Sequence, residues 1–245
     1  MDFEPFDSRS DRKSWTDRFQ AFIEILLVSG LVSGIAASYP LSFVYEKDAA
    51  ALLEDAIFMS IYLFLEAGIT FMLLAAVLKL RRETVRGLGL QWNRWKCQSI
   101  SGLAIVPFLF IINFLITFIF KIYLPQYYIE RNPLTEMIRT PQQLVLFIFS
   151  ALVAGGIKEE LQRAFILRMF SRYLGGAGVG LVLWSLAFGA GHYVQGVQGI
   201  VLATIYGFIF GVVYLLSGSL IAPIVAHSVY DTLALLGHWF FSGRS

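Results

Sequence analysis

The chain has 245 residues, of which 57% are hydrophobic and only 15% are charged. Because a soluble domain usually carries about 25% charged residues, this composition indicates a polytopic α-helical membrane protein. The formal net charge of +2 is too small to favour nucleic-acid binding. The single cysteine, Cys97, excludes an internal disulfide and a CxxC metal site.

Residues 1–20 are expected to form a polar cytoplasmic lead-in. They mix acidic and basic residues around no apolar core, so they do not resemble a signal peptide. The first predicted span is Ala21–Val44, with Glu24 near its start, and a short charged loop follows it. The second predicted span is Ala56–Leu78, which carries Glu66 in its middle.

The next segment, Lys79–Ser99, is basic and contains Trp92 and Trp95. Basic residues together with tryptophans are typical of an interfacial segment at a membrane surface. A third span, rich in Phe and Ile, is predicted at Ile100–Phe120, where Pro107 favours a kink.

The remaining chain predicts four more membrane helices and no separate soluble domain. Residues 21–141 would supply the N-terminal membrane helices, and residues 142–241 carry the polar motifs, all within one membrane domain. The fold class expected is an all-α bundle of about seven transmembrane helices plus the interfacial segment. The four further helices are predicted at Gln142–Phe170, Val179–His192, Val197–Leu216 and Leu220–Phe241.

Lysines and arginines are more frequent in the lead-in and in Lys79–Ser99 than in the alternate loops. Because cytoplasmic loops are enriched in these residues, the pattern predicts a cytoplasmic N-terminus. Seven spans then place the C-terminus outside, and we expect the protein in the plasma (inner) membrane.

The pattern Glu159-Glu160-Leu161-Gln162-Arg163 lies inside an otherwise apolar predicted helix. At helical spacing Arg163 can reach either carboxylate. An ion pair that stabilises a buried helix is one interpretation. A functional site is the other, because ionisable residues within a membrane usually face a cavity or a reaction centre.

His192 lies on the same helix face as Phe188, four residues earlier. Glu159 precedes Gly175 by as many residues as His192 follows Gly176. If these glycines form the turn of an antiparallel hairpin, the carboxylate and the imidazole lie at nearly the same depth. The register therefore predicts that Glu159 and His192 share one site.

The last predicted helix carries His227 and Asp231 at i,i+4 spacing. This spacing is compatible with a His–Asp pair that stabilises the helix bundle, or with a functional site.

Carboxylates and imidazoles together can activate water. A buried glutamate can act as a general base. Alternatively, Glu159, His192 and His227 could hold a zinc ion that lowers the pKa of its bound water. The residues alone leave both routes open.

These three motifs resemble the CAAX prenyl endopeptidase and bacteriocin-processing (CPBP, Abi) family of intramembrane proteases. Its members show Glu-Glu followed by Arg, then Phe-x-x-x-His, then His-x-x-x-Asn or His-x-x-x-Asp, on successive membrane helices. The resemblance implies that Glu159 and His192 activate water for attack on a peptide carbonyl. It also implies that His227 and Asp231 stabilise the oxyanion or complete a water or metal site, and that Arg163 holds a carboxylate.

One departure concerns the first motif, because the family has three residues between the second Glu and the Arg, and this chain has two. Matching the glutamates first moves Arg163 by about 100° around the helix. Matching Arg163 first puts Lys158 in place of the first Glu and Glu159 in place of the second. Glu159 belongs to the motif in both alignments, and we expect it to be the water-activating base.

The function expected is therefore an endopeptidase, either glutamate-dependent or a zinc metalloendopeptidase. Its partners would be the lipid bilayer and a peptide or membrane-protein substrate, with no nucleic acid. The motif departure leaves a non-catalytic membrane partner or immunity protein on the same scaffold as an alternative. A proton-coupled transporter is the third hypothesis, although the chain lacks the repeated halves that are common in transporters.

Overall fold

The computed structural model describes residues 13–44 and 55–241, and every regular element in these ranges is helical. Residues 45–54 of the predicted loop after the first span, and most of the lead-in, lie outside the described residues. The helices are α1 Trp15–Val28, α2 Leu31–Val44, α4 Ala56–Leu80, η1 Val85–Leu88, α5 Trp95–Tyr123, η2 Pro125–Tyr127, α6 Pro133–Glu136, α7 Pro141–Ser150, η3 Ala151–Glu159, α8 Glu160–Tyr173, α9 Ala177–Gly191, η4 Tyr193–Gln195, α10 Gly196–Ser217 and α11 Ile221–Phe241.

The predicted all-α fold is confirmed, and the described residues include four helical segments long and apolar enough to cross a membrane. These segments indicate an integral membrane protein. The α9 helix is apolar but shorter, and the stretch from α7 to α8 carries several charges. The four candidate spans are Trp15–Leu41, Ala56–Leu80, Trp95–Tyr123 and Tyr193–Ser217.

The first predicted span is one apolar stretch in the sequence but two helices in the structure. Helix α1 begins at Trp15, inside the predicted lead-in, because Ser14 forms a capping box with Asp17. It ends at Val28, and Gly30 adopts a φ of 94° before α2 begins. Such a positive φ favours glycine and interrupts the helix.

The predicted helix Gln142–Phe170 is present, but its middle is a π-helix. Thr140 caps the start of α7 and Pro141 occupies its first turn, a combination that favours helix initiation. The chain then passes through the π-helix η3 into α8 without a break. Because π-helical turns are rare and occur frequently at functional sites, this segment is a candidate location for a site.

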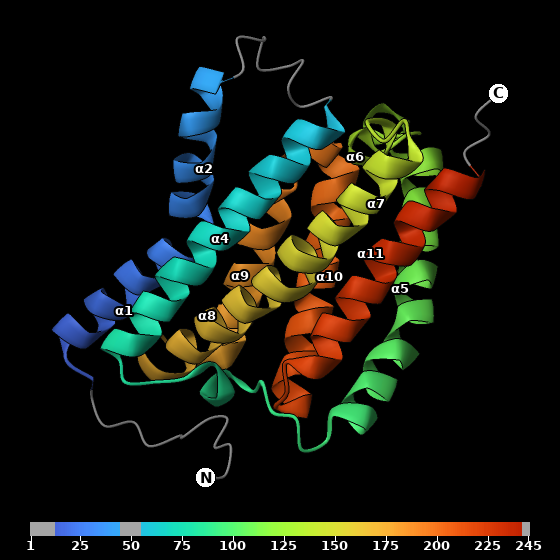
Figure 1. Ribbon diagram of the computed structural model, residues 1–245. Helices are drawn as coiled ribbons and strands as arrows, with labels where there is room; N and C mark the ends of the chain where they lie inside the picture. The colour runs from blue at the N-terminus through green and yellow to red at the C-terminus, as the bar shows by residue number, and fades with distance from the viewer. Residues whose placement is uncertain (1–12, 45–54, 242–245) are drawn as a thin grey trace.

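Helix α8 occupies the centre of the bundle, between α1 and α4 on one side and α9 on the other (Figure 1). Its apolar residues from Ala164 to Leu167 are fully buried, as is Met169. Glu160 and Arg163 on the same helix are also buried and therefore require polar partners.

The basic connector predicted at Lys79–Ser99 folds back against one end of the bundle. Arg172 pairs with Glu83 at 2.6 Å, and the Tyr214 hydroxyl donates a hydrogen bond to the Leu88 carbonyl at 3.1 Å. Leu220 N–H bonds to Gly89 O at 3.0 Å, which ties this connector to the turn before α11.

Helix α11 packs along α5, and a glycine permits their close approach. A Cβ built on Gly102 would lie 2.5 Å from the carbonyl oxygen of Ala222, a backbone atom that cannot rotate away. The contact holds α11, which carries His227, against the rest of the bundle.

We expect Gly102→Ala to separate α5 from α11 and to lower stability by about 1–3 kcal/mol, the usual cost of overpacking. Thermal unfolding of the purified protein in detergent measures this change. Gly178→Ala is the matched control, because a Cβ there meets no atom within 4 Å. Equal melting temperatures for the two variants would contradict the close packing.

Candidate active site

Two glycines in the π-helix η3 bring α11 against the glutamate segment. A Cβ on Gly155 would lie 2.8 Å from Asp231 Oδ2 and 3.5 Å from His227 Nε2. A Cβ on Gly156 would overlap the hydroxyl of Ser228. The absence of side chains at these positions therefore allows α11 to present its polar face directly to the backbone of η3.

The central contact of the site joins Glu160 to His227. Glu160 is 1% exposed, and its Oε1 lies 2.8 Å from His227 Nδ1. Arg163 also forms an ion pair with Glu160 Oε1. Because an ionised carboxylate can only accept hydrogen bonds, Nδ1 is the donor, and this bond fixes the orientation of the ring.

Arg163 is completely buried between two aromatic rings. Its guanidinium carbon lies 4.9 Å from the ring centre of Phe188 and 5.5 Å from that of Phe210. Its ion-pair partner among the described residues is Glu160. Cation–π contacts compensate part of the cost of burying this charge.

The other ring nitrogen of His227 faces two less buried carboxylates. Nε2 lies 3.5 Å from Asp231 Oδ2 and 3.9 Å from Glu159 Oε2. The side chains of Asp231 and Glu159 keep 28% and 18% of their exposure, whereas that of Glu160 keeps none. Separations of this size suit bridging by a small polar molecule better than a direct hydrogen bond.

Phe210 fixes the plane of the His227 ring. The two rings stack with centres 4.7 Å apart and an interplanar angle of 21°. The sequence contained no signal for this contact, because Phe210 is one of many phenylalanines in apolar helices.

His192 lies at the carboxyl end of α9, outside the contacts that join the other five predicted residues. Its Nδ1 is 2.8 Å from the Phe188 carbonyl, and the two rings are 4.6 Å apart. It interacts electrostatically with Asp231. No hydrogen bond or ion pair joins it to Glu159 among the described residues, so their shared role stays a prediction.

The structure places Lys158 in a second polar cluster. Its ammonium group pairs with Glu66 Oε2 at 2.7 Å, and it lies 3.9 Å from Glu159 Oε1. The sequence identified both residues as unusual, one as a mid-span carboxylate and the other as a departure from the motif. It did not indicate that they pair, because they are far apart in the chain.

The residues predicted to bind zinc do not form a preassembled ligand set. Within residues 13–44 and 55–241, no group of three or more His, Cys, Asp or Glu side chains is arranged to hold a metal ion. His227 already uses Nδ1 for Glu160, and His192 uses Nδ1 for a backbone carbonyl. A zinc ion held by Glu159, His192 and His227 stays a prediction, and no step below depends on it.

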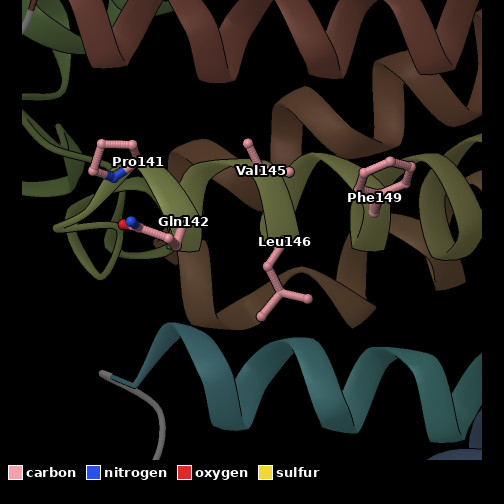
Figure 2. Close-up of a pocket in the computed structure, with 5 residues that line it drawn as sticks. All are labelled: Pro141, Gln142, Val145, Leu146 and Phe149. Carbon is pink, nitrogen blue, oxygen red and sulfur yellow. The ribbon is translucent and has the colours of Figure 1, made fainter.

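An apolar hollow of about 440 Å³ follows the outer face of α7. Figure 2 shows Leu146 pointing toward the neighbouring helix below it, while Val145 projects to the other side. None of the six predicted site residues lines this hollow, which is formed by Pro141, Gln142, Val145, Leu146 and Phe149.

Comparison with known proteins identifies the same segment that the motifs singled out. Residues 140–233 match the family model described as type II CAAX prenyl endopeptidase Rce1-like. The family resemblance predicted from the three motifs is thus confirmed over this part of the chain. No curated protein and no solved structure matches the chain.

We expect Arg163→Met to destabilise the protein by about 3–5 kcal/mol, because it removes one of the two charged or polar partners of the buried Glu160 carboxylate and leaves only His227. The double variant Glu160→Gln/Arg163→Met should recover most of this loss, since no net charge stays buried. Thermal unfolding measures both effects.

The control for this comparison is Arg131→Ala. It removes an exposed ion pair with Glu136, at 3.5 Å, and should cost less than about 1 kcal/mol. If Arg163→Met is no more destabilising than Arg131→Ala, the Glu160–Arg163 pair does not stabilise the core.

Proposed function

We propose, from the match of residues 140–233 to the Rce1-like type II CAAX prenyl endopeptidases, that this chain is an intramembrane endopeptidase. Its substrate would be a membrane-associated protein or peptide. The observation that carries the proposal is the convergence of three carboxylates on His227. Glu160, Glu159 and Asp231 come from two helices, and two of the three keep partial exposure.

In the proposed reaction Glu159 is the general base, assisted by His192. Its carboxylate removes a proton from a water molecule as the water oxygen attacks the peptide carbonyl carbon. The C–O bond forms, and the carbonyl electron pair moves to the oxygen. The same proton then passes from Glu159 to the amide nitrogen as the C–N bond breaks, which releases an amine and a carboxylic acid.

His227, as a doubly protonated imidazolium, would stabilise the tetrahedral oxyanion by donating a hydrogen bond from Nε2–H, and the negative charge of Asp231 beside Nε2 would favour this protonated ring. A ring fixed through Nδ1 presents Nε2 to the site without reorganisation, which is the condition for efficient electrostatic stabilisation. Glu160 would hold the ring in this orientation, and Arg163 would hold Glu160. These two residues are positioning residues because their side chains are buried behind His227.

The proposed topology is seven spans with a cytoplasmic N-terminus, formed by the four long apolar segments together with α7–η3–α8, α9 and α11. Two features support this orientation. Arg81 pairs with Glu24 of α1 and donates to the Tyr173 hydroxyl of α8 at 2.9 Å, and Lys13, just before α1, also lies over the Tyr173 ring, so two basic residues gather at the end where α1 begins. Figure 1 shows the start of α1 and the end of α11 at opposite ends of the bundle.

A non-catalytic membrane partner is the second candidate, and Lys158 favours it. If Arg163 is matched to the family motif first, Lys158 replaces a carboxylate of that motif. The contacts favour the other alignment, because Glu159 and Glu160 both face His227 and Lys158 turns to Glu66. Cleavage by the wild-type protein separates the two functions.

We expect Glu159→Gln to lower cleavage of a peptide library by about 10²–10⁴-fold, the usual contribution of a general base. Purified protein in lipid nanodiscs and mass spectrometry of the products provide the measurement. Glu24→Gln is the matched control, because Glu24 is also a buried carboxylate with an ionic partner, Arg81, outside the site. Equal cleavage by wild type and Glu159→Gln would refute the role of Glu159.

We expect chelation to leave cleavage unchanged, since the proposed chemistry uses only side chains of the chain itself. The purified enzyme is treated with 1,10-phenanthroline and EDTA, and its metal content is determined in parallel. Loss of activity that zinc alone restores would instead establish the zinc route through Glu159, His192 and His227.

A further inference from the structure

A second buried polar centre surrounds Glu66, in the middle of α4. Glu66 is 4% exposed, yet both of its oxygens have partners. Oε1 accepts hydrogen bonds from Ser33 at 2.9 Å and from Thr70 at 3.1 Å, and Oε2 accepts from Lys158 at 2.7 Å. Such complete pairing is the arrangement that a buried ionised carboxylate requires.

This centre lies where the first span is broken. The break at Gly30 exposes the Val28 carbonyl, which accepts a hydrogen bond from the Gln162 side chain at 2.6 Å. Helix α2 begins just after the break, and Ser33 lies in its first turn. The positive end of this helix therefore stabilises the negative charge of Glu66.

Lys158 connects this centre to the candidate active site. Its ammonium group is bonded to Glu66 and lies 3.9 Å from Glu159 Oε1. The other oxygen of the same carboxylate, Oε2, lies 3.9 Å from His227 Nε2. Glu159 is thus placed between one cation and one imidazole, with a different oxygen directed toward each.

We propose that Lys158, anchored by Glu66, is a positioning residue that directs the Glu159 carboxylate toward His227. This inference rests on the proposed function and adds Glu66, which lies outside the three family-like motifs, and Lys158, which precedes the Glu159-Glu160 pair. A purely stabilising role explains the pair less well, because a buried ion pair is often no more stabilising than apolar residues of the same volume. The pair also links the first span and α4 to the catalytic segment.

The decisive variant is the charge reversal Glu66→Lys/Lys158→Glu. It keeps an ion pair between the two positions but places a carboxylate, instead of a cation, beside Glu159. We expect kcat to fall by about 100-fold with little change in KM, the effect of displacing a reacting group by about 1 Å. A purely structural pair predicts wild-type kcat in this variant, and that result would overturn the proposal.

Two further variants keep the test decisive if the reversed pair does not fold. Glu66→Gln/Lys158→Met removes both charges, and we expect it to fold with a similarly reduced kcat. Lys158→Arg keeps the cation, and we expect kcat within a few-fold of wild type. Wild-type kcat in the neutral double variant would refute the positioning role, whatever its melting temperature.

A structural readout separates this inference from the proposed function. If the wild-type protein cleaves no peptide, the endopeptidase proposal fails, and the position of Glu159 can still be measured. Crystal structures of the wild type and of Glu66→Gln/Lys158→Met give the Glu159 Oε2 to His227 Nε2 separation directly. We expect it to exceed the 3.9 Å of the intact protein in the variant. An unchanged separation would contradict positioning by Lys158.

Discussion

The hydrogen bond between His227 and Glu160 is the interaction on which the rest of the site depends. Glu160 is buried in the centre of the bundle, where an ionised carboxylate is tolerated only with partners. Arg163 and His227 supply them from α8 and α11, so the bond connects the central helix to the last one. The same bond leaves Nε2 facing the two partly exposed carboxylates, Asp231 and Glu159.

Three consecutive residues of one helix face three different surroundings. Lys158 contacts Glu66 on α4, Glu159 remains partly exposed near His227, and Glu160 is enclosed with Arg163. Successive side chains on a helix point about 100° apart. Three consecutive charged residues can therefore contact different neighbouring helices. The π-helix before this run and its two glycines bring α11 close enough to complete the arrangement.

The six predicted site residues lie outside the four long apolar segments that could cross a membrane. The four long apolar segments make few contacts with these six residues. They pack around α8 and α11 instead. Polar side chains in a bilayer are stable when other helices shield them from hydrocarbon. Apolar helices therefore surround a polar centre. The hydropathy of any single helix does not reveal this arrangement.

The sequence by itself determined the all-helical membrane class and the segment that carries the motifs, because apolar run length and i,i+4 spacing are local properties. It also identified the Glu159–Arg163 pattern and the pair His227 and Asp231 as unusual polar groups in apolar helices. Only the tertiary structure decided which partners they have. The Glu66–Lys158 pair, the break at Gly30 and the stacking of Phe210 depend on contacts between helices far apart in the chain. No local pattern encodes such contacts, because the sequence contains several residues of the same chemical type that could have formed each pair. The packing of the helices decides which of them do.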